Sequence, residues 1–87
     1  MYNLRIRKTV EKSFHKLTKR NPKQLEIIEN KVSEIRLKPH HYKNLKAPLQ
    51  HLKRVHIDKS FVLTFSVDET NHTIVIEDYD HHDRIYK

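Results

Sequence analysis

Histidine, the residue type best suited to proton transfer near neutral pH, occurs eight times in this chain of 87 residues. Two short stretches combine it with cations or with an aromatic residue: Lys53, Arg54 and His56 in one, and His81, His82 and Tyr86 in the other. Cleaving RNA without a metal requires a base for the 2′-hydroxyl proton, a cation for the charge on phosphorus, and an acid for the leaving 5′-oxygen. The sequence contains all three components, but composition alone does not bring them together.

Other kinds of site are poorly represented. The chain has no cysteine, which excludes a disulfide framework, a thiol nucleophile and a zinc ribbon. It has no glycine either, which excludes a phosphate-binding glycine loop and leaves a serine triad without a tight elbow. The pairs His40-His41 and His81-His82 are adjacent, and adjacent side chains diverge, so a shared metal ion is disfavoured. We expect no metal and no cofactor.

The net charge of +7 is unevenly distributed along the chain. Residues 1–67 hold 16 Lys and Arg against 5 Asp and Glu, whereas residues 68–87 hold 2 against 6. This bias indicates a polyanionic partner, since the alternative, the solvated surface of a heat-adapted protein, normally mixes both signs. The longest apolar run, residues 74–76, is far too short to span a membrane. We expect one cytoplasmic domain over residues 1–87.

The first half of the chain changes from strand to helix periodicity. Residues 2–7 alternate between apolar and polar, which predicts a half-buried strand. Apolar residues at helical spacing follow in two groups: Val10, Phe14 and Leu17, then Leu25, Ile28, Val32 and Ile35. Between the groups Asn21 suits an N-cap and Pro22 the first helical position, and Pro39 ends the second helix after about Leu37. These signals predict a helical hairpin.

The second half predicts three strands, at residues 52–57, 61–67 and 73–78, separated by turns at 58–60 and 68–72. A three-residue turn would place Ile57 opposite Phe61 and Val55 opposite Leu63. One apolar set then faces the helices: Val55, Ile57, Phe61, Leu63, Phe65, Val67, Ile74 and Ile76. The other face would stay open, available to a nucleic acid. We predict an α+β fold in the order β-α-α-β-β-β, an antiparallel sheet packed on a two-helix hairpin.

This order of elements resembles the RelE/ParE superfamily of toxins from type II toxin–antitoxin modules. His56-Ile57 with Phe61 is similar to a histidine motif of the YafQ-type and archaeal RelE-type branch, and residues 82–86 are similar to that branch's terminal histidine-to-aromatic motif. The resemblance implies a ribosome-dependent mRNA endonuclease that inhibits translation by metal-independent cleavage. It also implies an acidic, RelB-like antitoxin that holds the toxin inactive in a hetero-oligomer.

The resemblance also implies roles for individual residues. His56 and His82 would share proton transfer, Tyr86 would stack on or activate the substrate, and Arg54 or Lys53 would provide the strand cation. Further basic residues would bind RNA: Lys38, Lys43, Lys46, Lys59, His81 and Arg84. Three positions depart from the family pattern, since Val62 replaces an arginine, Ser60 an acidic residue and Ala47 a histidine. These departures leave open whether the site is fully active.

Two other functions are compatible with the sequence. ParE-like members of the same superfamily act on DNA gyrase, although their C-terminal halves usually lack the paired histidine and terminal tyrosine. A basic module that binds RNA or the ribosome without cutting would carry the same charge bias. A map of mRNA cut sites in translating cells discriminates among the three.

Overall fold

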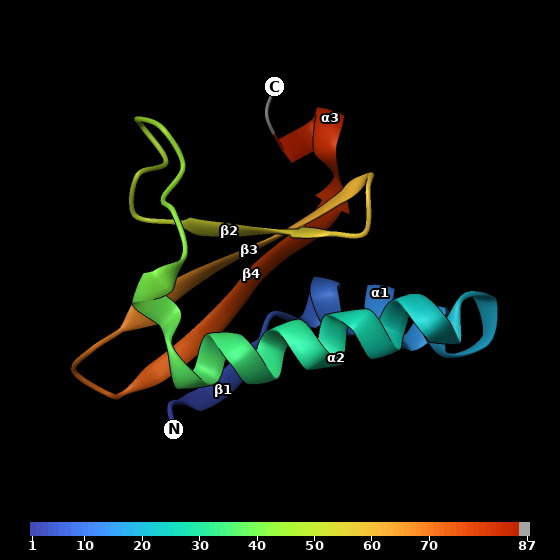
Figure 1. The fold of residues 1–87 in the computed structure, drawn as a ribbon, viewed down its shortest axis with the longest axis horizontal. Helices are drawn as coiled ribbons and strands as arrows, with labels where there is room; N and C mark the ends of the chain where they lie inside the picture. Colours follow the sequence, from blue (N-terminus) through green and yellow to red (C-terminus); the bar gives the residue numbers. More distant parts are fainter. Residues whose placement is uncertain (86–87) are drawn as a thin grey trace.

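The computed structural model describes residues 1–85, in which two helices pack on one face of a four-stranded sheet (Figure 1). Its elements are β1 (Asn3–Ile6), α1 (Lys8–Arg20), α2 (Pro22–Leu37), the 3₁₀ helix η1 (Pro39–His41), β2 (Lys53–Ile57), β3 (Phe61–Asp68), β4 (Thr73–His81) and α3 (His82–Ile85). The predicted order β-α-α-β-β-β is confirmed, and η1 and α3 are added to it. No helix in this part of the chain has the length and apolar character needed to cross a membrane.

The helical hairpin begins and ends where the sequence predicts. The Asn21 side chain accepts a hydrogen bond from the backbone N–H of Gln24 at 3.1 Å, which caps α2 at its first turn. Pro22 occupies the first position of α2, where its missing N–H leaves no bond unmade. Pro39 lies beyond the end of α2 and opens η1.

The sheet has the strand order β1-β4-β3-β2. The last three strands form the predicted antiparallel meander, and Ile57 faces Phe61 and Val55 faces Leu63 as expected. The predicted antiparallel sheet needs one correction, since β1 runs parallel to β4 and makes the sheet mixed. The α1–α2 hairpin separates β1 from the meander, and a parallel pair needs such a long crossover.

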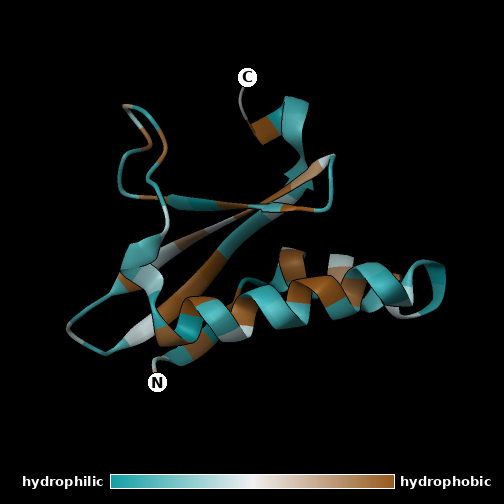
Figure 2. Cartoon of the chain, in the orientation of Figure 1, coloured by the Kyte–Doolittle hydropathy of each residue, from teal (hydrophilic) through white to brown (hydrophobic). Residues whose placement is uncertain are grey.

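The core lies between the helices and the sheet, where the apolar residues gather in Figure 2. Its buried members come from both layers: Val10, Ile28, Val32, Ile35, Val55, Ile57, Leu63, Phe65, Ile74 and Ile76. Phe61 and Val67 pack against this cluster at its edge. Buried Gln24 donates a hydrogen bond to the Tyr79 hydroxyl at 2.6 Å, which ties α2 to β4.

A β-bulge interrupts the pairing of β3 with β4. Thr64 pairs with Asp78 and Phe65 with Ile76, so Glu77 is an extra residue in β4. Beyond the bulge Tyr79 returns to the core, where it stacks on Phe61. Beyond the bulge β4 continues to His81, three residues past its predicted end.

The sheet face turned away from α1 and α2, here called the second face, is less open than predicted. The loop of residues 43–52 and α3 rise on that side of the sheet (Figure 1). Val62 is 0% and Thr64 2% exposed on the second face. The loop continues the strand ladder through hydrogen bonds from Leu45 N to Leu52 O and from Arg54 N to Lys43 O, at 2.8 and 3.0 Å. The prediction of an open face is thus corrected to a partly covered one.

Candidate active site

The rings of His56 and His82 stack on one another, with centroids 5.9 Å apart and planes inclined by 19°. His56 comes from β2, at the edge of the sheet, and His82 is the first residue of α3. The backbone N–H of His82 donates to the carbonyl of Ser60 at 2.7 Å, so the start of α3 is attached to the β2–β3 turn. Two segments far apart in sequence thus bring two imidazoles together.

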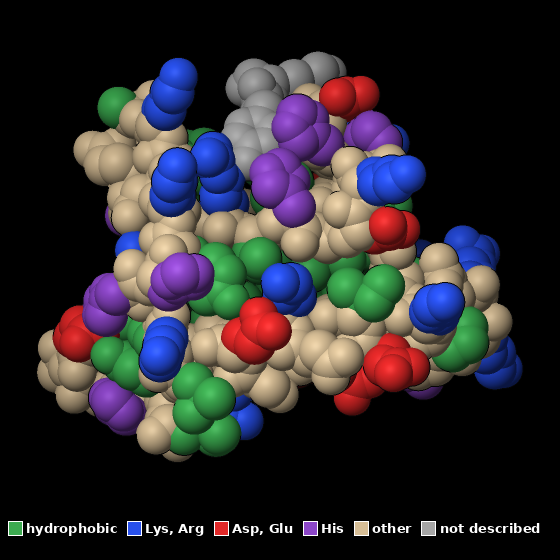
Figure 3. All heavy atoms as spheres, viewed as in Figure 1, with side chains coloured by type: hydrophobic (Ala, Val, Ile, Leu, Met, Phe, Trp, Pro, Cys, Tyr) green, Lys and Arg blue, Asp and Glu red, His purple; other side chains and the backbone are tan. Residues whose placement is uncertain are grey.

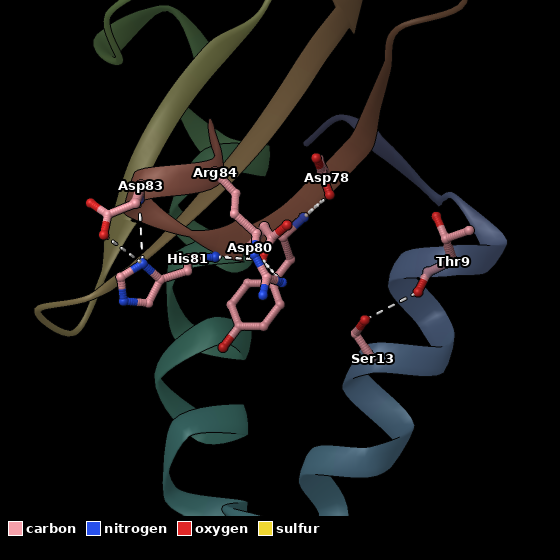
Figure 4. Close-up of polar contacts among 8 residues, drawn as sticks. Thr9, Ser13, Asp78, Asp80, His81, Asp83 and Arg84 are labelled. Atoms are coloured by element: carbon pink, nitrogen blue, oxygen red, sulfur yellow. Dashed lines mark hydrogen bonds and ion pairs between the residues drawn. The ribbon is translucent and has the colours of Figure 1, made fainter. Parts of the chain in front are cut away.

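Asp83 lies between the two adjacent histidines. Its carboxylate oxygens are 3.7 Å from His81 Nδ1 and 3.6 Å from His82 Nδ1, and each contact becomes an ion pair only when the imidazole is protonated. The Asp83 N–H also donates to His81 Nδ1 at 3.3 Å, as Figure 4 shows. The His81 ring meets the edge of Phe61 at 5.7 Å. Only His82 of this pair therefore joins His56, and sequence reasoning missed Asp83.

Arg54 lies on the same face of β2 as His56, two residues or about 6.6 Å along the strand. It lines a cavity of about 460 Å³ between the 43–52 loop and α3, together with Leu45, Lys46, Ala47, Pro48, Leu49 and Ile85. Figure 3 shows Lys and Arg side chains on the loop and histidines on the part of the surface across from it.

Lys53 lies away from this group. Strand alternation places it on the helix-facing side of β2, opposite to Arg54. Its ammonium donates to the Tyr42 carbonyl at 3.1 Å and to Asn44 Oδ1 at 2.9 Å. Of the two predicted strand cations, the structure brings only Arg54 to the second face beside His56, and Lys53 supports the base of the loop.

The predicted RNA-binding lysines fall into two groups. Lys43 and Lys46 are exposed on the 43–52 loop, and Lys59 is exposed on the turn beside Ser60. These three lie on the two segments that precede and follow β2, the strand that carries His56. Lys38 follows the end of α2 and lines a separate hollow with Leu37, His41 and Tyr42 among others, so the structure does not bring it to the site.

Arg84 projects from α3 and its Nη1 donates to Asp80 Oδ1 at 3.4 Å (Figure 4). The guanidinium is 75% exposed and can still reach an anion. Tyr86, the predicted stacking residue, lies outside the described residues.

The three departures from the family pattern have defined positions. Val62 is buried on the second face, paired with His56 on one side and Asp80 on the other. No side-chain cation is therefore available at that position, and Arg54, in the neighbouring row opposite Thr64, is the guanidinium nearest to it in register. Ser60 contributes its carbonyl to α3, and Ala47 lines the cavity.

A second polar cluster lies on the second face, toward β1. Glu77 accepts hydrogen bonds from Arg7 Nε at 2.9 Å and from Ser66 Oγ at 2.7 Å. Partial burial alone would raise the pKa of Glu77, but these two hydrogen bonds, together with the charges of Arg7 and His51, hold the pKa below its usual value. Over residues 1–85, no group of three or more His, Asp, Glu or Cys is arranged to hold a metal ion.

The chain is similar in sequence and in fold to known proteins. It is 55% identical over 87 residues to a Methanocaldococcus jannaschii protein named "Putative toxin RelE4". The matched region covers all of this chain and 93% of that protein. Its fold matches the RelBE2 toxin–antitoxin complex from Mycobacterium tuberculosis with a TM-score of 0.75 and 24% identity, covering 93% of this chain and 91% of that one. It also matches the YoeB–YefM complex from Staphylococcus aureus with a TM-score of 0.80 and 17% identity. That match covers 94% of this chain and 98% of the other. A scan against models of protein families finds no match.

Proposed function

The chain belongs to the RelE/ParE superfamily of toxins, and on this premise we propose that it is the toxin of a type II toxin–antitoxin module that inhibits translation by cleaving mRNA on the ribosome, without a metal ion. The observation that carries the proposal is the stacked pair His56–His82, on the same side of the sheet as Arg54. A histidine pair next to a guanidinium supplies the base, the acid and the cation that this reaction requires.

The reaction is a transfer within the RNA backbone. One imidazole takes the proton of the 2′-hydroxyl, and the 2′-oxygen forms a bond to phosphorus. The bond from phosphorus to the 5′-oxygen breaks, and the other, protonated imidazole gives its proton to that oxygen. Arg54, on the same face of β2 as His56, would balance the negative charge that grows on the non-bridging oxygens. The products are a cyclic phosphate and a 5′-hydroxyl.

Ribosome dependence follows from how exposed the site is. His56 and His82 lie on the surface, and a flexible single strand placed there rarely adopts the in-line arrangement that the reaction needs. An mRNA held in the decoding site is already ordered, and Lys43, Lys46 and Lys59 can bind neighbouring phosphates. We therefore expect slow cleavage of free RNA and fast cleavage on translating ribosomes.

The antitoxin partner is inferred from charge and from the fold relatives. The basic body of residues 1–67 is complementary to an acidic segment that folds as it binds. The RelBE2 and YoeB–YefM structures are toxin–antitoxin complexes, which supports a partner of the same kind here.

The test is controlled expression of the wild type, His82→Ala and His15→Ala, with mRNA 5′ ends mapped by primer extension. His15 is exposed on α1 and provides a matched control. Wild type and His15→Ala should arrest growth and produce codon-phased cuts, whereas folded His82→Ala should do neither. A toxic, folded His82→Ala protein contradicts the assignment. DNA damage with intact mRNA would favour a gyrase-directed toxin, and neither effect would favour a binding module.

A further inference from the structure

We propose that Asp83 is a positioning residue for the reaction. Its carboxylate favours the protonated form of His82, which makes His82 the general acid and His56 the general base. The inference rests on the proposed RNA-cleaving function and extends it to the separate roles of the two histidines. Asp83 is the second residue of α3 and follows His82 directly in the chain.

The Asp83 carboxylate acts on His82 rather than on His81. Its oxygens lie 3.6 Å from His82 Nδ1 and 3.7 Å from His81 Nδ1. The backbone N–H of Asp83, however, donates to His81 Nδ1 at 3.3 Å, so that nitrogen is an acceptor and carries no proton (Figure 4). The carboxylate therefore meets a proton at His82 Nδ1, where it stabilises the imidazolium. Proton transfer to the leaving 5′-oxygen is then assigned to the other ring nitrogen of His82, Nε2.

The stacked pair holds one proton more easily than two. The ring centroids of His56 and His82 are 5.9 Å apart, so a charge on one imidazole disfavours a charge on the other. Within residues 1–85, carboxylates contact His40, His81 and His82 but not His56. The guanidinium of Arg54, on the same face of β2 as His56, further disfavours a charge on His56. The proton therefore resides on His82, and neutral His56 accepts the proton of the 2′-hydroxyl.

The other charged and titratable groups around the pair do not reverse this order. They are His56 and Arg54 on β2, Asp58 and Lys59 on the β2–β3 turn, Asp80 and His81 on β4, Arg84 on α3 and Lys46 on the 43–52 loop. The carboxylate of Asp80 is paired with Arg84 at 3.4 Å. Asp58 and Lys59 are adjacent and of opposite sign. The contact with Asp83 thus distinguishes His82 from its partner.

The place of His82 does not depend on the Asp83 side chain. The backbone N–H of His82 donates to the Ser60 carbonyl at 2.7 Å, and the hydrogen bond from Asp83 to His81 also uses a backbone N–H. The Asp83 side chain is 83% exposed, so its replacement removes a charge and no buried contact. Asp83→Asn therefore changes the electrostatics of the site and preserves its framework.

Titration of the imidazoles in the free protein tests the charge effect without requiring catalysis. Followed by NMR, the His82 ring should lose its proton about half a pH unit lower in Asp83→Asn than in wild type, because the contact is exposed and screened. Asp83→Glu should restore most of this difference. Glu26→Gln removes an exposed carboxylate from α2, in the helix layer, and should leave the His82 titration unchanged. A His82 titration that is the same in Asp83→Asn and wild type overturns the proposal.

The pH profile of single-turnover cleavage on programmed ribosomes tests the roles of the two histidines. The acid must be protonated and the base neutral, so the acid sets the basic limb of the profile and the base sets the acidic limb. Asp83→Asn should move the basic limb about half a unit lower, which slows cleavage there about threefold, and should leave the acidic limb in place. A shift of the acidic limb, or an equal loss of rate at every pH, overturns the proposal. A shifted His82 titration in a protein that never cuts mRNA would instead uphold the charge effect of Asp83 and remove the proposed nuclease, so the two failures are distinguishable.

Discussion

His56 and His82 stack at 5.9 Å because of a bulge that lies five residues before His82. Glu77 is the extra residue of β4, and it shifts the alternation of every residue that follows. Regular pairing would turn His81 to the second face and His82 toward the helices. The bulge reverses this, so that His82 reaches His56 and His81 contacts Phe61. One inserted residue thus decides which histidine joins the site.

If the two rings act on one phosphate as proposed, the rate losses caused by removing each of them should overlap. His56→Ala and His82→Ala should each lower single-turnover cleavage on programmed ribosomes by about a hundredfold to ten-thousandfold. The double variant should be little slower than the worse single variant, since a base without its acid gives little rate enhancement. Losses that multiply in the double variant would show that the two histidines act separately.

Lys53 should matter for stability more than for chemistry. Its ammonium holds Tyr42 O and Asn44 Oδ1, at the base of the 43–52 loop. We expect Lys53→Met to lower the free energy of unfolding by about 1 kcal/mol, because the two bonds are partly exposed. Hydrogen exchange at the Leu45 and Leu52 amides should become faster. Lys43→Met, at an exposed loop position, serves as the control. Unchanged exchange in Lys53→Met contradicts this role.

The parts of the fold that were predictable have local signals. Asn21 and Pro22 mark the start of α2 by capping chemistry, and a three-residue turn fixes the register of β2 against β3. The apolar alternation of β2 and β3 then identifies the face that packs on the helices. Such features depend on neighbours in the sequence, so a single sequence reveals them.

The bulge and the covered second face had no such signal. Glu77 is one polar residue among several, and nothing in its neighbourhood marks it as unpaired. Residues 82–85 are mostly charged or polar and resemble a tail, yet the bond from His82 N to Ser60 O helps hold them as α3. The bulge and the start of α3 therefore arise from tertiary contacts, whereas the position of Arg54, rather than Lys53, on the second face follows from the apolar alternation of β2.

The hydrogen bond between Gln24 and Tyr79 should contribute measurably to stability. Tyr79→Phe would leave the buried Gln24 amide without its acceptor at 2.6 Å. We expect a loss of about 1–2 kcal/mol in urea unfolding. Tyr42→Phe is the control, because the Tyr42 hydroxyl donates to Glu34, whose carboxylate is 57% exposed and can be solvated instead. Equal losses in both variants would contradict a special role for the buried pair.

Glu77 should make stability depend on pH in the acidic range. Its pKa in the folded protein lies below the ordinary 4.5, because the hydrogen bonds from Arg7 and Ser66 and the charges of Arg7 and His51 together outweigh the effect of burial. A lowered pKa means that the carboxylate stabilises the fold above pH 4.5 and that this stabilisation is lost as the pH falls through the folded value. The stability gap between wild type and Glu77→Gln should therefore be constant near neutrality and shrink below pH 4.5. A stability difference between wild type and Glu77→Gln that stays constant below pH 4.5 would contradict the lowered pKa of Glu77.

The antitoxin should bind through charge on the side of the sheet that carries the histidine pair. We expect an acidic antitoxin to be encoded beside this chain. Co-expressed with it, the antitoxin should restore growth and copurify as a complex whose affinity falls with salt. Lys43 and Lys46 lie on the 43–52 loop, whereas Lys12 and Lys16 lie on α1, and all four are exposed. Reversing either pair to Glu changes the net charge equally, so the comparison separates location from total charge. If the acidic segment lies over the second face, Lys43→Glu/Lys46→Glu should lower the affinity for the antitoxin tenfold or more. Lys12→Glu/Lys16→Glu should lower that affinity only slightly. Equal losses would mean attraction to overall charge, and a larger loss at α1 would place the partner on the helices.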